Sequence, residues 1–219
     1  MKVLVIGAGG NLGRRLVERA LAHGHQVTAF LRDPSRFALE HPRLAETVDR
    51  VAVGDVLDPG ALGEAMAGQD VVLNAAGNVT DGEQFARTFR AVADAAQAGR
   101  LPRLWMVAGA AILTIPHADR LGVSLPGVPP IYRIHERNWR YLEGLEIDWS
   151  LMCPGPMVLA GDGTLRYDLR VSVDEVPFAV GAWAAWAAWA PAIALSLMFK
   201  AKSAELIVTY EDVAELMVR

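Results

Sequence analysis

The chain has 219 residues, of which 53% are hydrophobic and 21% charged, so it can bury a substantial core and does not have the composition of a disordered protein. Its 21 Lys and Arg against 25 Asp and Glu give a formal charge of −4, which argues against nucleic-acid binding because phosphate recognition needs a basic surplus. The one cysteine, Cys153, excludes an intrachain disulfide and a zinc site built from several cysteines. We therefore expect no metal site and a reducing, cytoplasmic location.

Short apolar runs alternate with helical patterns along the first half of the chain, as in βαβ units around a parallel sheet. Strands are expected at Lys2–Ile6, Gln26–Leu31, Val48–Val53, Asp70–Asn74 and Leu104–Val107. Helices are expected over Leu12–His23, from an Asp58-Pro59 N-cap to near Gly68, and from Thr80, which has capping-box spacing to Glu83, to Gly99. The pattern predicts an α/β fold of Rossmann type with a doubly wound parallel sheet.

The second half is less regular. A loop over residues 112–130 is followed by an expected helix at Tyr132–Glu143, strands at Asp148–Met152 and Leu206–Val208, and a terminal helix at Glu211–Val218. We assign all of these elements to a single NAD(P)-binding domain over residues 1–219. Its substrate-side elements are expected at about 110–135 and 154–202.

A glycine cluster, GAGGNLG, separates the first strand from the first helix. Glycines at this junction allow a tight turn, let the backbone approach a pyrophosphate, and let the helix pack near the sheet with its N-terminus facing the anion. The alternative is an ordinary strand–helix turn, but the repeated βαβ pattern favours dinucleotide binding. The cofactor loop is predicted to comprise Gly7, Gly9, Gly10, Asn11, Leu12 and Gly13.

The residues after the second strand select the cofactor. NAD-binding proteins usually place an acidic residue there, whereas this strand ends at Leu31-Arg32, and Arg14 follows the last loop glycine. Two guanidinium groups suit the 2′-phosphate of NADP(H). The alternatives are that both arginines are solvated, or that Asp33 is the acidic residue; because Pro34 follows it, Asp33 is expected to turn the chain.

Other cofactor contacts are expected where strands end, since ligands of such sheets bind at the carboxyl edge. Asp55 is a candidate acceptor for the adenine amino group, although it and Asn74 can also be read as turn residues. The remaining predicted contacts at this edge are Val56, Ala75, Ala76, Gly77, Ala108 and Pro154.

Five segments carry a family resemblance: GAGGNLG, LRDPSR, VGDVLD, the Asp148–Leu151 strand running into CPGP, and TYEDVAELM. Together they resemble the NAD(P)H-binding atypical short-chain dehydrogenases, a group related to NmrA and to the flavin reductase/biliverdin reductase family. The resemblance covers nearly the whole chain except residues 177–202. It implies a Rossmann fold, NADPH binding and, in many members, reductase activity on a flat or hydrophobic substrate.

The chain departs from the usual short-chain dehydrogenase pattern at the catalytic residues. No serine stands in the Ala108–Ala111 segment after the fifth strand, and Tyr132 is followed four residues later by Glu136, where a lysine would lower the tyrosine pKa. His135 falls where the flavin/biliverdin reductase relatives also carry a histidine. His135 and Tyr132 are therefore the candidate catalytic residues, with His135 able to donate a proton near neutral pH or to orient substrate; the alternative is that His135 is an exposed helix residue.

These features predict an NADPH-dependent reductase of a hydrophobic small molecule of the enone, quinone, imine or flavin type. Water can supply the proton in such a reaction, so the missing Ser-Tyr-Lys triad does not exclude catalysis. The missing triad also allows a non-catalytic NADP(H)-sensing regulator of NmrA type. An isomerase or dehydratase on the same fold is a third hypothesis.

Residues 176–199 contain no charged side chain and include Trp183, Trp186 and Trp189 at three-residue spacing. This spacing predicts a helical stripe, and we expect a lid or wall that gives the nicotinamide end an apolar, aromatic pocket. A homodimer surface and peripheral membrane contact are the alternatives, and both monomer and homodimer remain open. Pro177 and Pro191 argue against a membrane span.

Overall fold

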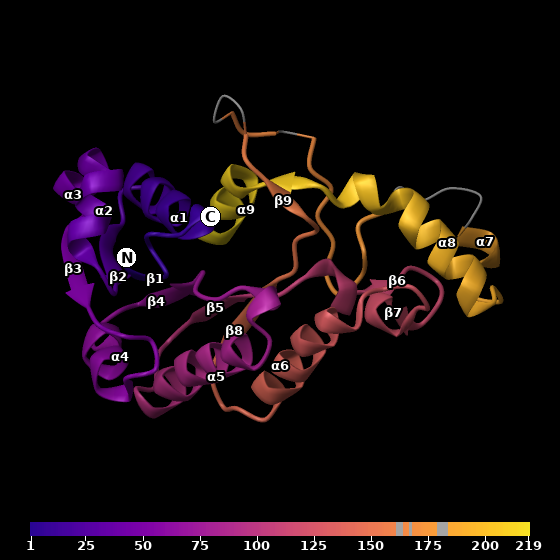
Figure 1. The fold of residues 1–219 in the computed structure, drawn as a ribbon, viewed down its shortest axis with the longest axis horizontal. Helices are drawn as coiled ribbons and strands as arrows, with labels where there is room; N and C mark the ends of the chain where they lie inside the picture. The colour runs from indigo at the N-terminus through magenta and orange to yellow at the C-terminus, as the bar shows by residue number, and fades with distance from the viewer. Residues whose placement is uncertain (161–163, 167, 179–183) are drawn as a thin grey trace.

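The computed structural model describes residues 1–160, 164–166, 168–178 and 184–219. Six parallel strands form its central sheet in the order β3-β2-β1-β4-β5-β8 (Figure 1). Their bounds are β1 Lys2–Ile6, β2 Gln26–Leu31, β3 Arg50–Val53, β4 Val71–Asn74, β5 Leu104–Val107 and β8 Trp149–Met152. This order confirms the predicted Rossmann-type sheet. The order reverses between β1 and β4, which opens a ligand crevice beyond the carboxyl ends of these strands.

Helices cover both faces of the sheet (Figure 1). Alternate residues of β1 explain the two layers, because Val3 and Val5 belong to one buried cluster and Leu4 and Ile6 to the other. The first cluster includes residues of α1 Asn11–Ala22, α2 Pro34–Glu40 and α9 Tyr210–Val218. The second includes residues of α4 Pro59–Met66, α5 Glu83–Ala98 and α6 Arg133–Glu143.

The segment between β2 and β3 differs from the sequence prediction. It contains two short helices, α2 and α3 Pro42–Thr47, and β3 begins at Arg50 rather than at Val48. Asp33 turns the chain as expected, and its carboxylate accepts a hydrogen bond from the backbone N–H of Arg36 at 2.9 Å, capping α2. Each of the two helices has proline in its first turn, where the missing N–H costs no hydrogen bond.

The predicted start of the long helix at Thr80 is wrong. The side chain of Asn78 accepts a hydrogen bond from the backbone N–H of Thr80, which caps a short 3-10 turn over Val79–Asp81. Gly82 then has a φ of 55°, and α5 begins only at Glu83. By contrast, the Asp58 N-cap of α4 is confirmed, since its carboxylate accepts from the N–H groups of Gly60 and Ala61.

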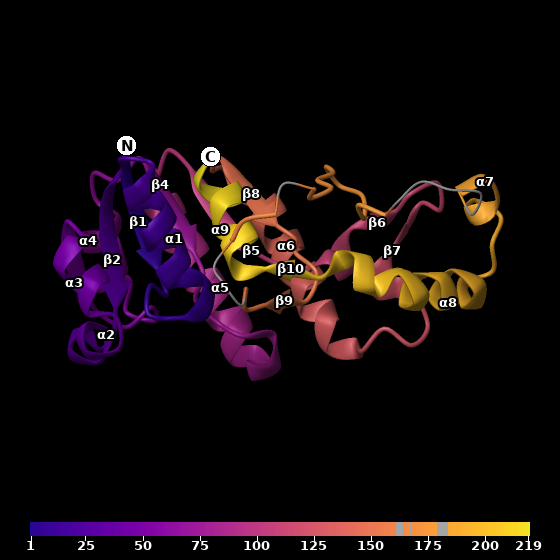
Figure 2. The ribbon, with the colours of Figure 1, turned by 90° about the horizontal axis from the view of Figure 1, so that it is seen from above.

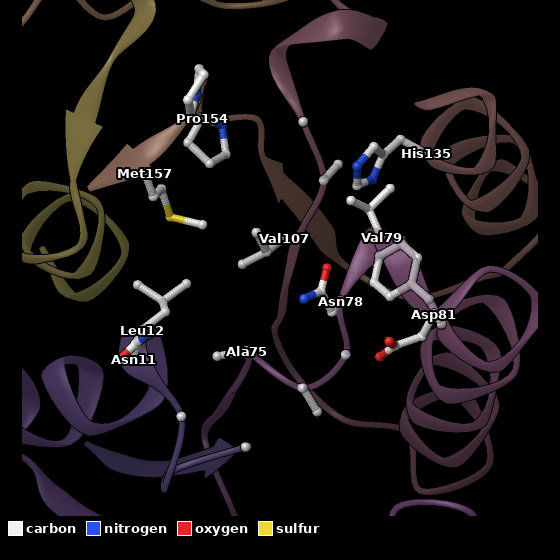
Figure 3. Close-up of a pocket in the computed structure, with 18 of the residues that line it drawn as sticks. Asn11, Leu12, Ala75, Asn78, Val79, Asp81, Val107, His135, Pro154 and Met157 are labelled. Atoms are coloured by element: carbon white, nitrogen blue, oxygen red, sulfur yellow. The ribbon is translucent and has the colours of Figure 1, made fainter. Parts of the chain in front are cut away.

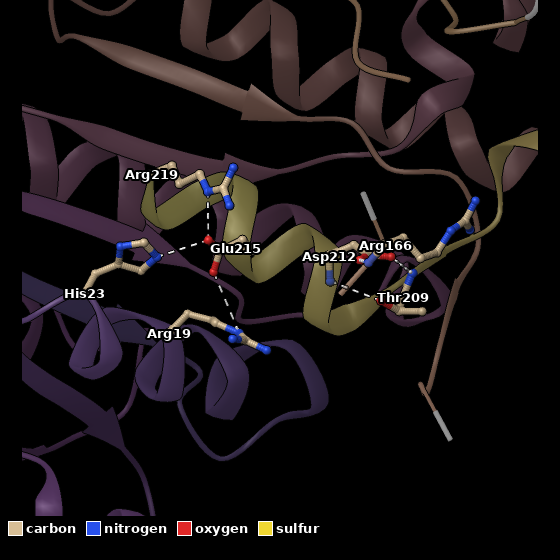
Figure 4. A network of polar contacts seen from close by, with 7 residues as sticks. All are labelled: Arg19, His23, Arg166, Thr209, Asp212, Glu215 and Arg219. Atoms are coloured by element: carbon tan, nitrogen blue, oxygen red, sulfur yellow. Dashed lines mark hydrogen bonds and ion pairs between the residues drawn. The ribbon is translucent and has the colours of Figure 1, made fainter. Parts of the chain in front are cut away.

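The C-terminal part returns to the first helix. β10 Val208–Thr209 pairs with β9 Met157–Val158 and not with the central sheet, and a 3-10 turn occupies Ser203–Leu206, where part of the last strand was expected. Thr209 and Asp212 form a capping box at the start of α9, and Asp212 also accepts from the backbone N–H of Arg166 (Figure 4).

Charged side chains join α9 to α1. Glu211 is paired with Arg15 in a buried contact, and Arg15 also donates to the carbonyl of Asn11 at 2.7 Å. Figure 4 shows Glu215 surrounded by Arg19 and His23 of the α1 segment and by Arg219 of its own helix, with separations of 3.8, 3.1 and 2.7 Å. The last helix is therefore tied by ion pairs to the helix that begins at the glycine loop.

An extension, which we call the arm, projects from the end of the molecule beyond β8 (Figures 1 and 2). It consists of the hairpin β6 Thr114–Ile115 and β7 Arg120–Leu121 together with α7 Ala184–Ala187 and α8 Ala192–Lys202. The arm has a small core of its own, formed by Ile115, Ala118, Leu125, Ala187, Ala190 and Leu195.

The tract predicted to form a single tryptophan-bearing helix is divided. α7 ends at Ala187, and Pro191 is the N-cap of α8, a position outside the helix interior, where proline would break the helix. Trp183 lies outside the described residues. Within the part of the chain that the structure describes, no helix has the length and apolar character needed to cross a bilayer.

Candidate coenzyme and substrate site

A cavity of about 1350 Å³ lies at the carboxyl edge of the sheet. Figure 3 shows side chains from separate elements around it, among them Asn11 at the start of α1, Val107 in β5 and His135 in α6. Most of the predicted site residues line it: Gly7, Gly9, Gly10, Asn11, Leu12, Arg32, Asp55, Val56, Ala75, Ala76, Gly77, Ala108, Tyr132, His135 and Pro154. Gly13, Arg14 and Asn74 are the predicted residues outside this lining.

The glycine loop brings the N-terminus of α1 to the cavity. Gly7 has a φ of 79°, and a Cβ there would lie 2.8 Å from the backbone nitrogen of Ala76. Gly10 donates its N–H to the carbonyl of Gly7 at 2.9 Å and precedes α1 without any side-chain cap. An uncapped helix N-terminus with no acidic residue in its first turn provides free N–H donors and a positive dipole end, which fits a pyrophosphate.

Gly13 has a packing function. A Cβ at this position would lie 2.0 Å from the carbonyl oxygen of Gly7, so only glycine lets α1 pack this closely against the loop. A Cβ at Gly10 would meet only that same oxygen, at 3.3 Å, and Gly10 lines the cavity. The two glycines thus have different roles: Gly13 shapes the loop and Gly10 leaves room for a ligand.

Basic side chains lie near the end of β2. Arg32 and Arg36 both line the cavity, as does Glu40, whose carboxylate accepts from the Nε of Arg36 at 2.8 Å. The hydrogen bond from Arg36 to Glu40 and the attraction between their charges raise the pKa of the Arg36 guanidinium. Arg14 is half-buried on α1 away from the lining. The sequence analysis missed Arg36, because only the turn of α2 brings it to the same side as Arg32.

Two polar residues shape the loops after β3 and β4. Asp55 accepts from the backbone N–H of Leu57 at 2.8 Å while lining the cavity. Asn74 is buried, and its side-chain oxygen accepts from the N–H of Ala76 at 3.0 Å. Asn74 therefore positions the Ala75–Gly77 turn, which lines the cavity in its place.

His135 is buried, contrary to the alternative that it is an exposed helix residue. Burial lowers its pKa to about 4, so its ring is neutral at pH 7. The sequence analysis had expected this imidazole to titrate near neutral pH, and that expectation is wrong. A Cβ on Gly109, which lines the cavity, would lie 3.1 Å from its Nε2. Its Nδ1 is buried without a hydrogen-bond partner in the described part of the chain, and its ring stacks on that of Tyr132, with 6.3 Å between the centroids.

The remaining walls extend the cavity beyond the expected coenzyme contacts. They are mostly apolar and come from the turn over residues 126–129, from β9, from α8 and from the segment that follows α8: Pro126, Val128, Pro129, Met157, Leu197, Phe199, Leu206 and Tyr210. Trp186 and Trp189, the two tryptophans of the tract that the structure describes, are not among the lining residues. The aromatic wall expected from them is supplied instead by Phe85, Tyr132 and Phe199.

Two further observations bear on the chemistry of the site. Within the described ranges, no group of three or more His, Cys, Asp or Glu residues is arranged to hold a metal ion. Cys153 is half-buried, and burial raises the pKa of its thiol to about 12, so it is a neutral thiol and not an activated nucleophile.

The parallel sheet, the glycine loop and the cavity beside the N-terminus of α1 define a Rossmann-type dinucleotide-binding protein. The chain belongs to the NAD(P)H-binding family, whose pattern matches residues 7–179.

A curated relative, an isoflavone reductase homolog from Zea mays, is 27% identical over 183 residues, covering 75% of this chain and 58% of the relative. Across the curated relatives compared, the matched regions span only 19–58% of their lengths. A Rossmann-fold NAD(P)-binding family protein from Shigella flexneri superposes with a TM-score of 0.60 at 22% identity, covering 99% of this chain and 84% of that one.

The Citrobacter triphenylmethane reductase complexed with NADP(H) superposes with a TM-score of 0.57 at 20% identity, covering 72% of this chain and 50% of that one. At these identities the two solved structures establish the shared fold alone.

Proposed function

We propose that the protein is an NADPH-dependent reductase of a hydrophobic small molecule with a conjugated carbonyl, quinone, imine or flavin group. The observation that carries this proposal is the shape of the cavity, which continues from the glycine loop past Ala108 to an apolar end beside His135. A coenzyme sensor needs only the first part. The reductase names of the curated relatives support the same reaction class.

The polar groups fit a dinucleotide. The Gly10–Leu12 backbone suits the pyrophosphate, and Arg32 with Arg36 suits a 2′-phosphate, to which guanidinium groups bind through charge-assisted hydrogen bonds. In this structure the Arg36 guanidinium is bound by Glu40, and a 2′-phosphate would compete with this carboxylate for the guanidinium. When bound, NADPH supplies a hydride.

The chain's own residues then hold and orient the substrate. Neutral His135 can donate a hydrogen bond from Nε2 to a substrate oxygen or nitrogen, because its other ring nitrogen is buried. Tyr132 and Phe85 lie against this imidazole and present aromatic surface to a flat substrate. Since the imidazole is not an acid at neutral pH, water is the proton source.

The coenzyme preference is tested by calorimetry with NADPH and NADH. NADPH should bind at least about tenfold more tightly, which corresponds to about 1.4 kcal/mol, a modest value for a charge-assisted contact. Arg32→Ala and Arg36→Ala should each reduce the preference, whereas Arg14→Ala is the matched control and should retain it. Equal affinities in the wild type would contradict the 2′-phosphate assignment.

The reaction is tested by following NADPH oxidation against flavins, quinones and enones, with Gly10→Val as the control that lacks coenzyme binding. Turnover of at least one class supports a reductase. The rival is a non-catalytic NADP(H) sensor, which the serine-free Ala108–Ala111 segment favours. Tight NADPH binding without turnover of any class would favour the sensor.

A further inference from the structure

The end of the arm exposes four large apolar side chains that the proposed reaction does not use as a group. The exposed fractions are 42% for Trp186, 87% for Trp189, 68% for Ile193 and 66% for Leu197. We call these four residues the apolar tip. Exposed apolar residues occur singly on most proteins, but a cluster within one short segment marks an interaction surface.

The apolar tip faces outward because the opposite side of α8 is already packed. Leu195 is fully buried in the core of the arm, whereas Ile193 and Leu197, two residues before and after it, lie about 200° away around the helix. Ile193 and Leu197 are four residues apart and share one face of α8. Figures 1 and 2 both show α7 and α8 at the end of the molecule, away from the central sheet.

The distribution of charged residues around the apolar tip is compatible with its transfer from water into an apolar environment. No charged side chain occurs in residues 176–199, so the apolar tip can leave water without desolvating an ion of this segment. Lys200 lies near the end of α8, is exposed and lines the cavity, and Lys202 pairs with Glu205 at 2.6 Å. Tryptophan beside apolar residues, with lysine at the border, is the composition of segments that lie at a membrane surface.

We propose that the apolar tip docks on the surface of a lipid bilayer. The available area argues against a second copy as the occupant. At roughly 150–250 Å² for a large side chain, the exposed parts of these four residues offer on the order of 500 Å², below the roughly 800 Å² per partner of a stable protein interface. A projecting end can insert between lipid headgroups without a matching surface on the other side.

The position of Leu197 connects this surface to the cavity. Leu197 belongs to the apolar tip and also lines the cavity, so one wall of the cavity adjoins the docked face. A hydrophobic substrate dissolved in the bilayer would then reach the site without crossing water. This route rests on the proposed function, whereas the docking itself does not.

The docking is tested by flotation of the full chain with phosphatidylcholine vesicles and with the same vesicles containing phosphatidylglycerol. The wild type should float with both, more strongly with the second because of Lys200. Trp189→Ser and Ile193→Ser should each weaken the partition by about tenfold, since each removes several buried carbon atoms from the lipid. Leu39→Ser is the matched control: Leu39 is 83% exposed on α2, far from the arm, and its replacement should change nothing.

Folding and coenzyme binding are checked in every variant by circular dichroism and calorimetry, neither of which depends on turnover. Wild-type protein that stays with the unbound fraction overturns the proposal whether or not a substrate is known. Vesicle binding that Leu39→Ser weakens as much as Ile193→Ser also overturns it. A concentration-dependent dimer, observed by sedimentation and dissociated by Ile193→Ser, would also overturn the proposal, because a second copy of the chain would then cover the apolar tip.

Discussion

Gly10 and Gly13 flank the start of α1, but the absent Cβ atom serves a different purpose at each. Gly10→Val should abolish NADPH binding while the fold is retained, because the added side chain occupies the space next to the loop where a pyrophosphate fits. Gly13→Ala should instead destabilise the protein, since its Cβ would overlap the carbonyl of Gly7. Calorimetric titration and thermal unfolding of both variants separate these effects.

The opposite pattern would contradict this division of roles. If Gly10→Val binds NADPH normally, the loop does not hold the pyrophosphate. If Gly13→Ala unfolds like the wild type, then α1 can move away from Gly7 at no cost and the close packing is not required.

His135 makes the stability depend on pH in a defined window. Its pKa is lowered to about 4 in the folded chain from an ordinary value of 6.5, so between these values the unfolded chain binds the extra proton. The contribution of His135 to the free energy of unfolding should therefore fall as pH decreases from about 6.5 towards about 4. His135→Gln should flatten this part of the profile in chemical unfolding at a series of pH values. Parallel profiles for the two proteins would show that the imidazole is not buried in solution.

The residues of the site could be predicted to different degrees. The glycine loop was predictable because its spacing follows directly from the backbone approach that a pyrophosphate requires. Arg36 was not, since it depends on the direction of α2, and the burial of His135 was not, since it depends on how α6 packs beside Phe85. Asn74 was placed at the correct strand end, with a ligand contact and a turn role both open, and its side-chain oxygen accepts a hydrogen bond from the backbone N–H of Ala76.

At the scale of elements, the contact between α1 and α9 depends on ionised carboxylates. Burial alone would raise the pKa of Glu211, but the hydrogen bonds it accepts from Arg15 and from backbone N–H groups lower it below its ordinary value. For Glu215 the bonds from Arg219 and His23 likewise outweigh burial and lower the pKa. A lowered carboxylate pKa gives stability that is present at neutral pH and lost as pH falls through the folded-state pKa.

Glu211→Gln should therefore lower the free energy of unfolding at pH 7 and reduce its loss in acid. The buried Arg15 would lack its charged partner, and breaking a buried ion pair on one side costs about 3–5 kcal/mol. The control is Glu46→Gln, at an exposed site on α3 that has no ion pair within the described part of the chain. Denaturant unfolding at pH 7 and pH 4 measures both variants; an unchanged Glu211→Gln profile would mean that the pair adds no stability.

Elements with a strong local signal were predictable, and those fixed by tertiary packing were not. The strands β1, β2, β4 and β5 follow mostly buried apolar runs, whereas β3 is apolar but largely exposed. β8 ends at Met152, just before the Pro-Gly-Pro turn that begins at Pro154. The helix α2 carries only one buried side chain, Phe37, so its sequence has little amphipathic pattern to recognise. The pairing of β9 with β10 joins segments about 50 residues apart, and no local pattern in two-residue strands specifies such a pairing.

At the scale of the whole molecule, coenzyme should protect one part of the chain and leave another unchanged. NADPH at a hundredfold excess over its Kd should add about 2.7 kcal/mol to the free energy of unfolding. Hydrogen exchange should slow in the glycine loop and in the Ala75–Gly77 turn, which line the cavity. It should not slow at Ile115 and Leu195, because the arm has a separate core. Equal slowing in both regions would show that the arm and the sheet respond as one unit.

The ion pairs between α1 and α9 have a consequence for how the chain can vary. These ion pairs hold α9 against α1, and β8 holds the chain in the central sheet up to Met152. The segment between Met152 and α9 is therefore a long loop whose two ends are fixed. The entropy of closing such a loop changes slowly with its length. We therefore expect insertions and deletions in this segment to reshape the part of the cavity that it lines, while the glycine loop at the start of α1 keeps its geometry.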